Sequence, residues 1–405
     1  MKRIISAILS AMMVISLFAA IPANAAEEYK TMLPYYYSQL EKSEKTVYLA
    51  MRKAILEQKS SVTVKSNVDD GTANYLTEIF YSEDPLTFNL ESTEWDGNGG
   101  KTTFNFEYTY TKKTASSMKQ KMASTAAKVV SNFTSKTTDY NKALYIHDYL
   151  TGKSSFVPNA KYASEAYGAL IDKKADDLGY ARAFSYLCTK AGLKNVTVYG
   201  KRGGYFYGWN RVCIDKKWYD IDVGSDDRIY NLVQPANHAF FMNGNNFCSG
   251  YDEEALPLTF PKGTSDRSMS YYNQKNLVAK TAVDAFALLR SEIVKAANNG
   301  KQSAEISFEK KSEYNKFVDL LFSNEEDYEI PRLYTHIMFP ASQKTSVLVP
   351  YVRYDDVMTL TSSYTVHIYF YKRNTNIYDY FIDISDLEDD ELEFFEEYQI
   401  DTKKK

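Results

Sequence analysis

Hydrophobic residues recur at helical spacing in three segments of the first 151 residues. Residues 38–58 place apolar side chains three or four positions apart, which predicts an amphipathic helix with one buried stripe. That stripe consists of Leu40, Val47, Tyr48, Met51, Ala54 and Ile55. Residues 115–133 and 138–151 predict two further helices by the same criterion.

A two-residue alternation, typical of β-strands, appears in other segments. The expected strands are 62–64, 86–90, 103–110, 196–199, 205–214 and 218–223. Turn residues predict a turn at 95–100 and a short hairpin turn at 215–217. A helix beginning at Asp176 or Asp177 precedes the last three strands and ends before Gly192.

The C-terminal third predicts a second, smaller α+β domain. Residues 261–276 are polar and read as a linker, and Thr281 with Asp284 forms a capping pair that opens a helix ending before Gly300. The elements expected after it are a strand at 304–308, a helix at 314–322, and strands at 347–351 and 364–371. The acidic run 386–397 is interpreted as a solvated helix end.

The first 25 residues have the pattern of a secretory signal. Lys2 and Arg3 precede an apolar segment, and a small-residue cleavage site ends at Ala25. The predicted organisation is a signal peptide at 1–25, a first domain at 27–260, a linker at 261–276 and a domain of unknown type at 277–405. We therefore expect a secreted protein, extracellular or at the cell surface, with no membrane span after signal cleavage.

Composition narrows the function classes. The formal net charge of −4 lacks the basic character of a nucleic-acid-binding protein. Three cysteines at wide spacing form neither a disulfide framework nor a zinc motif, and Cys188 and Cys213 are expected to be small buried side chains. The four histidines contain no i, i+4 pair, so structural roles are expected, with His238 the one that could lie near a site. No metal and no cofactor are predicted.

Asp220, Asp222, Asp226 and Asp227 raise the question of a calcium loop. Their spacing does not match the Asp-x-Asp-x-Asp-Gly pattern of a calcium loop, because Gly224 stands at the fifth position and Ser225 at the sixth. A solvated acidic turn is the preferred interpretation.

Residues 168–184 read GALIDKKADDLGYARAF, which resembles the nucleophile region of the transglutaminase-like superfamily, usually "GAL.DGKAVC.GYARAF". In this resemblance the catalytic Cys position is Asp177. The family's "HAWN" appears as YGWN, which puts Tyr207 at the catalytic His position, and "WY.vD" appears as WYDID, which keeps the Asp at Asp222. The segment IHDYL at 146–150 also resembles the family. The resemblance is strongest over 138–245 and implies a papain-like fold of the α+β class, with a helix N-terminus facing an antiparallel sheet.

These replacements remove the groups that perform the family's chemistry. A Cys–His–Asp site needs a thiolate nucleophile and an imidazole that accepts its proton. A carboxylate at Asp177 is a poor nucleophile, and Tyr207 is a poor proton acceptor near neutrality. We therefore expect a pseudoenzyme rather than an enzyme, in which Asp177 serves chiefly as a helix cap.

Three functions follow as hypotheses. The first is binding of an extracellular peptide, protein or cell-wall glycan or muropeptide through the inherited cleft, where Tyr205, Tyr207 and Trp209 share one strand face and Asp177 and Asp222 accept hydrogen bonds. The alternative for that face is a buried Trp209 and a Tyr207 that fills the space of the His. The second function is glycan hydrolysis by an Asp177/Asp222 pair. The third is a structural or adhesion protein with a vestigial cleft.

Overall fold

A computed structural model of the chain describes residues 32–228, 237–244, 251–253, 259–325, 328–342, 344–345, 347–348, 357–360 and 363–372. The expected signal peptide, Cys248 and the acidic run 386–397 lie outside these residues. The chain divides into two compact units: residues up to Ser135 together with Ser185–Val196, and Lys136–Phe184 together with Thr197 onward. This division differs from the expected domains, because the N-terminal segment is a unit of its own and residues after 276 belong with the second unit. None of the described helices is long and apolar enough to cross a membrane.

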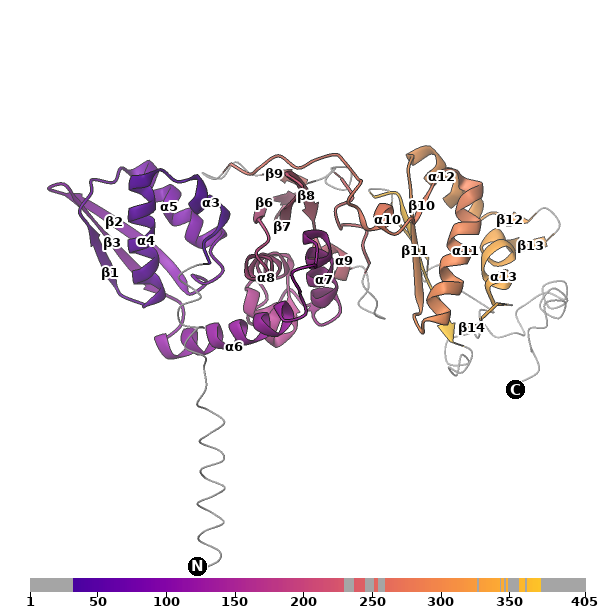
Figure 1. The fold of residues 1–405 in the computed structure, drawn as a ribbon, viewed down its shortest axis with the longest axis horizontal. Helices are drawn as coiled ribbons and strands as arrows, with labels where there is room; N and C mark the ends of the chain where they lie inside the picture. Colours follow the sequence, from indigo (N-terminus) through magenta and orange to yellow (C-terminus); the bar gives the residue numbers. More distant parts are fainter. Residues whose placement is uncertain are drawn as a thin grey trace, which may run out of the picture. The chain divides into compact units, whose positions relative to one another are not determined.

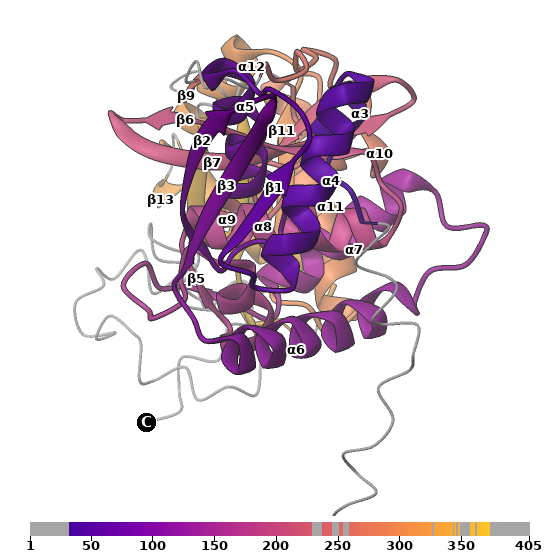
Figure 2. The same cartoon turned by 90° about the vertical axis from the view of Figure 1, so that its left-hand side faces the viewer.

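The first unit pairs helices with a three-stranded antiparallel sheet of order β1-β3-β2 (Figures 1 and 2). A reciprocal capping box between Glu41 and Glu44 opens α4, and Asp69 caps α5 by accepting from the Thr72 N–H. The six apolar residues predicted for the first helix are all buried. The elements are α3 (Tyr35–Gln39), α4 (Lys42–Leu56), β1 (Ser61–Val64), α5 (Asp70–Ser82), β2 (Leu90–Asn98), β3 (Lys101–Tyr108) and α6 (Lys112–Val130).

A buried charged group lies in the core of this unit. Asp84 accepts hydrogen bonds from the Tyr48 hydroxyl at 3.0 Å and from the Arg52 guanidinium, and all three side chains are nearly inaccessible. Lys119 of α6 is also buried, with 8% of its surface exposed. Burial lowers the pKa of Lys119 to about 8, with smaller effects from Asp84 and Arg52.

The second unit begins with the elements that carry the sequence motifs. An antiparallel sheet of order β8-β7-β6-β9 follows α8, and α7 packs against α9. Asp215 and Lys216 have positive φ in the tight turn between β7 and β8. The elements are α7 (Asp139–Thr151), β4 (Ser155–Phe156), η1 (Gly168–Asp172), β5 (Lys174–Ala175), α8 (Asp177–Lys190), β6 (Asn195–Arg202), β7 (Tyr205–Ile214), β8 (Lys217–Ile221), α9 (Val223–Arg228) and β9 (Tyr251–Glu253).

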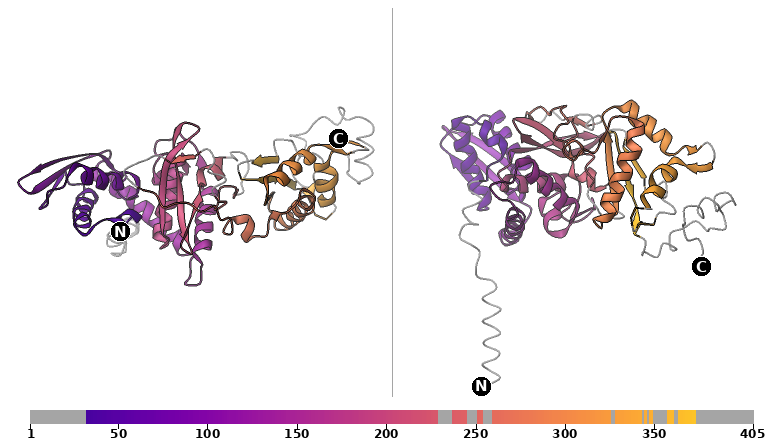
Figure 3. Two further views of the ribbon diagram at one scale, coloured as in Figure 1. Left: turned by 90° about the horizontal axis from the view of Figure 1, so that it is seen from above. Right: turned by 45° about the vertical axis from the view of Figure 1, so that its right-hand side comes forward.

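The later part of the second unit forms a mixed sheet of order β10-β11-β16-β15 with α11 and α12 packed against it (Figures 1 and 3). Thr281 caps α11 as predicted. The elements are α10 (Tyr271–Gln274), β10 (Val278–Ala279), α11 (Ala282–Asn298), β11 (Ser303–Phe308), α12 (Lys311–Leu321), β12 (Asn324–Glu325), β13 (Tyr328–Pro331), η3 (Leu333–Met338), α13 (Phe339–Ser342), β14 (Val347–Leu348), β15 (Val357–Leu360), β16 (Thr365–Tyr369) and β17 (Tyr371–Lys372).

The α+β class and most predicted elements are confirmed, with four corrections. Residues 86–89 form turns rather than a strand, and 95–98 extend β2, so that the turn is reduced to Gly99 and Gly100, both with positive φ. The helix α5 was not predicted. The expected linker is anchored: Arg211 donates to the Pro261 carbonyl, and Arg267 donates to the Phe308 carbonyl.

Candidate functional site

The N-terminus of α8 is held by Asp176. Its carboxylate accepts from the Gly179 N–H at 2.9 Å, and its carbonyl accepts from the Tyr180 N–H. The prediction that Asp177 provides the cap is therefore wrong, because the preceding residue performs that task. Position 179 has room only for glycine, because a Cβ there would lie 1.9 Å from the Ala163 carbonyl oxygen.

Asp177 is the first residue of α8, half-buried, and its carboxylate is directed to the start of α9. A Cβ built on Gly224 would lie 3.3 Å from Asp177 Oδ1 and 3.6 Å from Asp222 Oδ1. Both carboxylates thus border the same point beside Gly224. The helix dipole favours a negative charge at this first turn.

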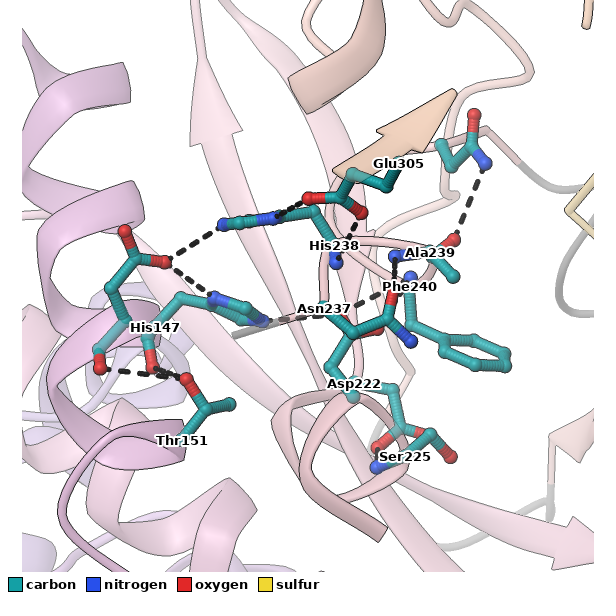
Figure 4. A network of polar contacts seen from close by, with 12 residues as sticks. His147, Thr151, Asp222, Ser225, Asn237, His238, Ala239, Phe240 and Glu305 are labelled. Atoms are coloured by element: carbon teal, nitrogen blue, oxygen red, sulfur yellow. Dashed lines mark hydrogen bonds and ion pairs between the residues drawn. The ribbon is translucent and has the colours of Figure 1, made fainter. Parts of the chain in front are cut away.

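Tyr207 joins these residues from β7. Its hydroxyl donates to Asp222 Oδ2 at 2.7 Å and lies 3.0 Å from the Ser225 hydroxyl. Asp222 follows β8 and also accepts from the Ser225 N–H at 2.9 Å, through Oδ1. The three positions identified from the sequence motifs therefore meet at one place (Figure 4 shows Asp222 and Ser225).

Arg202, at the end of β6, completes this group. It donates to the Tyr207 hydroxyl at 3.0 Å, and its guanidinium lies 3.7 Å from Asp222 Oδ2. The guanidinium lies over two aromatic rings, with centroid distances of 5.3 Å to Tyr207 and 5.5 Å to Phe240. The Tyr207 hydroxyl therefore contacts both the Arg202 guanidinium and the Asp222 carboxylate.

The remaining residues of the "HAWN"-like segment serve the fold. Trp209 is 1% exposed and donates its indole N–H to Asp220 at 2.8 Å, so it lies in the core. Asn210 donates to the Ala181 carbonyl of α8 at 3.0 Å and ties the helix to the sheet. Tyr205 is 81% exposed, whereas Tyr207 is 3% exposed. The continuous aromatic face expected for Tyr205, Tyr207 and Trp209 is therefore interrupted after its first member.

The interpretation of a solvated acidic turn is wrong. Asp220 is buried with Arg211, whose Nε donates at 2.7 Å, and Asp226 is buried against His147 at 3.0 Å. Asp227 accepts from the Tyr180 hydroxyl at 2.7 Å, and burial raises the pKa of Asp227 to about 6. Sequence spacing excluded a calcium loop, but it did not reveal these pairings.

The electrostatics of the site oppose proton transfer by Tyr207. Burial, followed by the negative charges of Asp222 and Asp177, raises the pKa of Tyr207 well above its ordinary value. Its proton is therefore retained near neutrality and is directed at Asp222. In this geometry Tyr207 donates a hydrogen bond and does not act as a general base.

Neither of the two cysteines that the structure describes lies at the position of the family's catalytic Cys. Cys188 is fully buried within α8, and burial raises the pKa of its thiol well above the ordinary value, as expected for a small core side chain. Cys213 is partly exposed on β7. Two residues of the site, Arg202 and Ser225, were not predicted, because neither belongs to a motif.

A helix N-terminus packed on an antiparallel sheet, with three converging motif positions, defines a papain-like α+β domain. Residues 124–223 match the model of the transglutaminase-like superfamily, so this region of the chain is similar to that family. No curated protein gave a significant sequence match.

Three solved structures were compared with the whole chain. A protein named as a TGase is 14% identical, with a TM-score of 0.26, covering 50% of this chain and 59% of its own. A proposed cysteine protease from Cytophaga hutchinsonii is 10% identical, with a TM-score of 0.24, covering 40% and 65%. A proposed protease from Parabacteroides distasonis is 8% identical, with a TM-score of 0.21, covering 32% and 35%. The chain thus spans less than two thirds of each of these proteins.

Proposed function

We propose that this protein is a catalytically degenerate member of the transglutaminase-like superfamily that is exported and binds an extracellular peptide, protein or cell-wall glycan. The observation that carries the loss of chemistry is the contact from Tyr207 to Asp222 at 2.7 Å. This phenol occupies the position where the resemblance implies an imidazole. The phenol donates a hydrogen bond to Asp222 and keeps its proton, so it cannot accept a proton from a nucleophile as an imidazole would.

The other half of the argument lies at Asp177. Its carboxylate, beside Asp222 and at the first turn of α8, is stabilised as an anion by the helix dipole. An anion is suited to accept hydrogen bonds from hydroxyl or ammonium groups. As a nucleophile it would form a labile anhydride, so the residue supports binding rather than catalysis.

A binding role is supported by the tip between β6 and β7, residues 201–206. Tyr205 and Phe206 are 81% and 53% exposed, and Phe206 stacks on Tyr199 with a centroid distance of 5.8 Å. Lys201 is exposed at the same tip. Exposed aromatic rings beside a cation can stack on a sugar ring or clamp an extended peptide that carries carboxylates. Of the five residues predicted for binding, Tyr205 and Asp177 remain accessible.

The test is a binding screen of the purified mature protein against cell-wall glycans, muropeptides and unfolded peptides. We expect Tyr205→Ala to weaken retention at least tenfold, because the ring supplies the exposed stacking surface. Tyr145→Ala is the matched control, since Tyr145 is also exposed, at 39%, but lies on α7. A screen without any ligand, or equal retention by both variants, would contradict the proposal and favour a structural or adhesion role.

A second candidate, glycan hydrolysis, is favoured by one observation only. Asp177 Oδ1 and Asp222 Oδ1 lie 3.3 Å and 3.6 Å from one point, the Cβ position of Gly224, so they are at most about 7 Å apart, a range that includes the spacing of a retaining carboxylate pair. Against it, both oxygens of Asp222 already accept hydrogen bonds, and Asp222 is only 2% exposed. Release of reducing sugar that disappears in Asp177→Asn would favour this candidate over binding.

A further inference from the structure

Two histidines that are far apart in the sequence meet at one carboxylate. His147 lies on α7, and His238 lies in the segment 237–244. His147 Nδ1 is 3.0 Å from Asp148 Oδ1, and His238 Nε2 is 3.0 Å from the same oxygen. These three ligand atoms all lie within 4.8 Å of one another.

The outer nitrogen of each imidazole faces a second carboxylate. His147 Nε2 is 3.0 Å from Asp226 Oδ2, and His238 Nδ1 is 2.6 Å from Glu305 Oε1 (Figure 4). Glu305 is on β11 and is itself fixed by the Tyr272 hydroxyl at 2.8 Å. Metal-binding histidines typically donate their other N–H to a carboxylate, which sets the tautomer and the ring orientation. Both imidazoles meet this condition.

The rings are also fixed by packing. Tyr271 stacks on His238 with centroids 3.6 Å apart and planes at 4°, and Phe241 meets His147 edge-on at 5.2 Å. The side chains of His147 and His238 are 0% and 7% exposed, whereas that of Asp148 is 45% exposed. The fold therefore fixes the positions of both imidazoles, and Asp148 is the residue of the cluster that is accessible to solvent.

We propose that His147 Nδ1, Asp148 Oδ1 and His238 Nε2 bind a divalent transition metal such as Zn²⁺. Zinc binds imidazole nitrogen and carboxylate oxygen at about 2.0–2.2 Å, so side-chain shifts of about 1 Å bring these atoms to coordination distance. Imidazole ligands select transition metals over Ca²⁺ and Mg²⁺. Three protein ligands leave a fourth position for water or another molecule on the side of Asp148.

Metal binding replaces the hydrogen bonds at the centre of the cluster. His147 Nδ1 and His238 Nε2 would then face the metal, while the outer nitrogens of the two imidazoles stay beside Asp226 and Glu305. The site shares no ligand with the Tyr207 group and does not depend on the proposed extracellular binding function.

The test is calorimetric titration of the tag-free, chelator-treated mature protein with Zn²⁺, with bound metal counted by mass spectrometry. We expect one Zn²⁺ per chain and no comparable binding of Ca²⁺. Asp148→Asn should weaken binding at least tenfold, and Glu305→Gln by about 10–100-fold through loss of the group that orients His238. Asp139→Asn, an exposed carboxylate on the same helix, is the matched control and should bind as the parent does.

Substitution of Co²⁺ adds a spectroscopic check, since a site with two imidazoles and a carboxylate gives visible absorption bands that Asp148→Asn changes. Circular dichroism and melting temperature establish that each variant is folded. The proposal is overturned if the folded parent binds no Zn²⁺, or if Asp148→Asn binds as tightly as the parent. In either case the cluster is a hydrogen-bonded network alone.

Discussion

Tyr207→Phe tests whether the phenol hydroxyl stabilises the site formed by Tyr207, Asp222 and Arg202. The substitution keeps the ring under Arg202 and removes one hydroxyl. That hydroxyl donates to Asp222 at 2.7 Å and accepts from Arg202 at 3.0 Å. Hydrogen bonds to charged groups contribute about 1.5–3 kcal/mol each. Asp222 keeps the Ser225 N–H and the nearby guanidinium, so we expect a net loss of about 2 kcal/mol in the free energy of unfolding.

Removal of the whole ring has a larger effect. Tyr207 is 3% exposed, so Tyr207→Ala leaves a cavity in addition to the lost hydrogen bonds. Deletion of a buried aromatic ring costs about 3–5 kcal/mol, which places the expected loss for this variant near the upper end of that range. Tyr205→Ala, at an 81% exposed position, should change stability by less than about 0.5 kcal/mol.

Urea unfolding followed by tryptophan fluorescence measures these differences in the second unit alone. The chain has three tryptophans, of which Trp95 lies in the first unit and Trp209 and Trp218 lie in the second. A Trp95→Phe background therefore removes the signal of the first unit. If Tyr207→Phe unfolds at the same urea concentration as its parent, the hydroxyl does not stabilise the site and the reasoning fails.

Four other outcomes follow from the structure. Gly179→Ala should cost about 3 kcal/mol or prevent folding, because its Cβ would lie 1.9 Å from a main-chain carbonyl oxygen, and soluble yield and urea midpoint measure this. Asp176→Ala should cost about 1 kcal/mol through loss of the α8 cap, again read from the urea midpoint. The pKa of Lys119 falls from the ordinary 10.5 to about 8, so the folded state releases this proton first and stability should rise between about pH 8 and 10.5. Calorimetric melting should show this rise in the parent and not in Lys119→Met. Asp177→Cys with Tyr207→His should restore at most weak amidase activity, because catalysis needs positioning within about half an ångström. Turnover near that of an active family member would contradict this prediction, because it would show that the residues around the two substituted positions still support catalysis.

Much of the fold could be predicted from local pattern. The stripe on α4 and the cap at Thr281 were found because helix periodicity and capping depend on neighbours in sequence. The strand predicted at 86–90 was wrong over residues 86–89, since Leu86 is buried from a turn and only Leu90 belongs to a strand, as the first residue of β2. A short apolar run does not by itself distinguish a strand from a buried turn.

The site was partly predictable for a related reason. Asp177, Tyr207 and Asp222 were identified because each stands at a fixed place in a motif, and the structure brings them together. Arg202 and Ser225 were missed, because their part depends on distances in space that the motifs do not encode. The contact between His147 and His238 through Asp148 was missed for the same reason. The two histidines are 91 residues apart in the sequence and come together through the packing of α7 against the segment 237–244.

The central proposal, that this chain has lost the acyl-transfer chemistry of the family it resembles, is tested most directly by turnover of the purified protein. Amide hydrolysis and amine incorporation should be measured for the parent and for Asp177→Asn, which keeps the shape of the side chain and removes its charge. We predict that both proteins stay at the level of the blank. Turnover by the parent that persists through further purification and falls at least tenfold in Asp177→Asn would contradict the account.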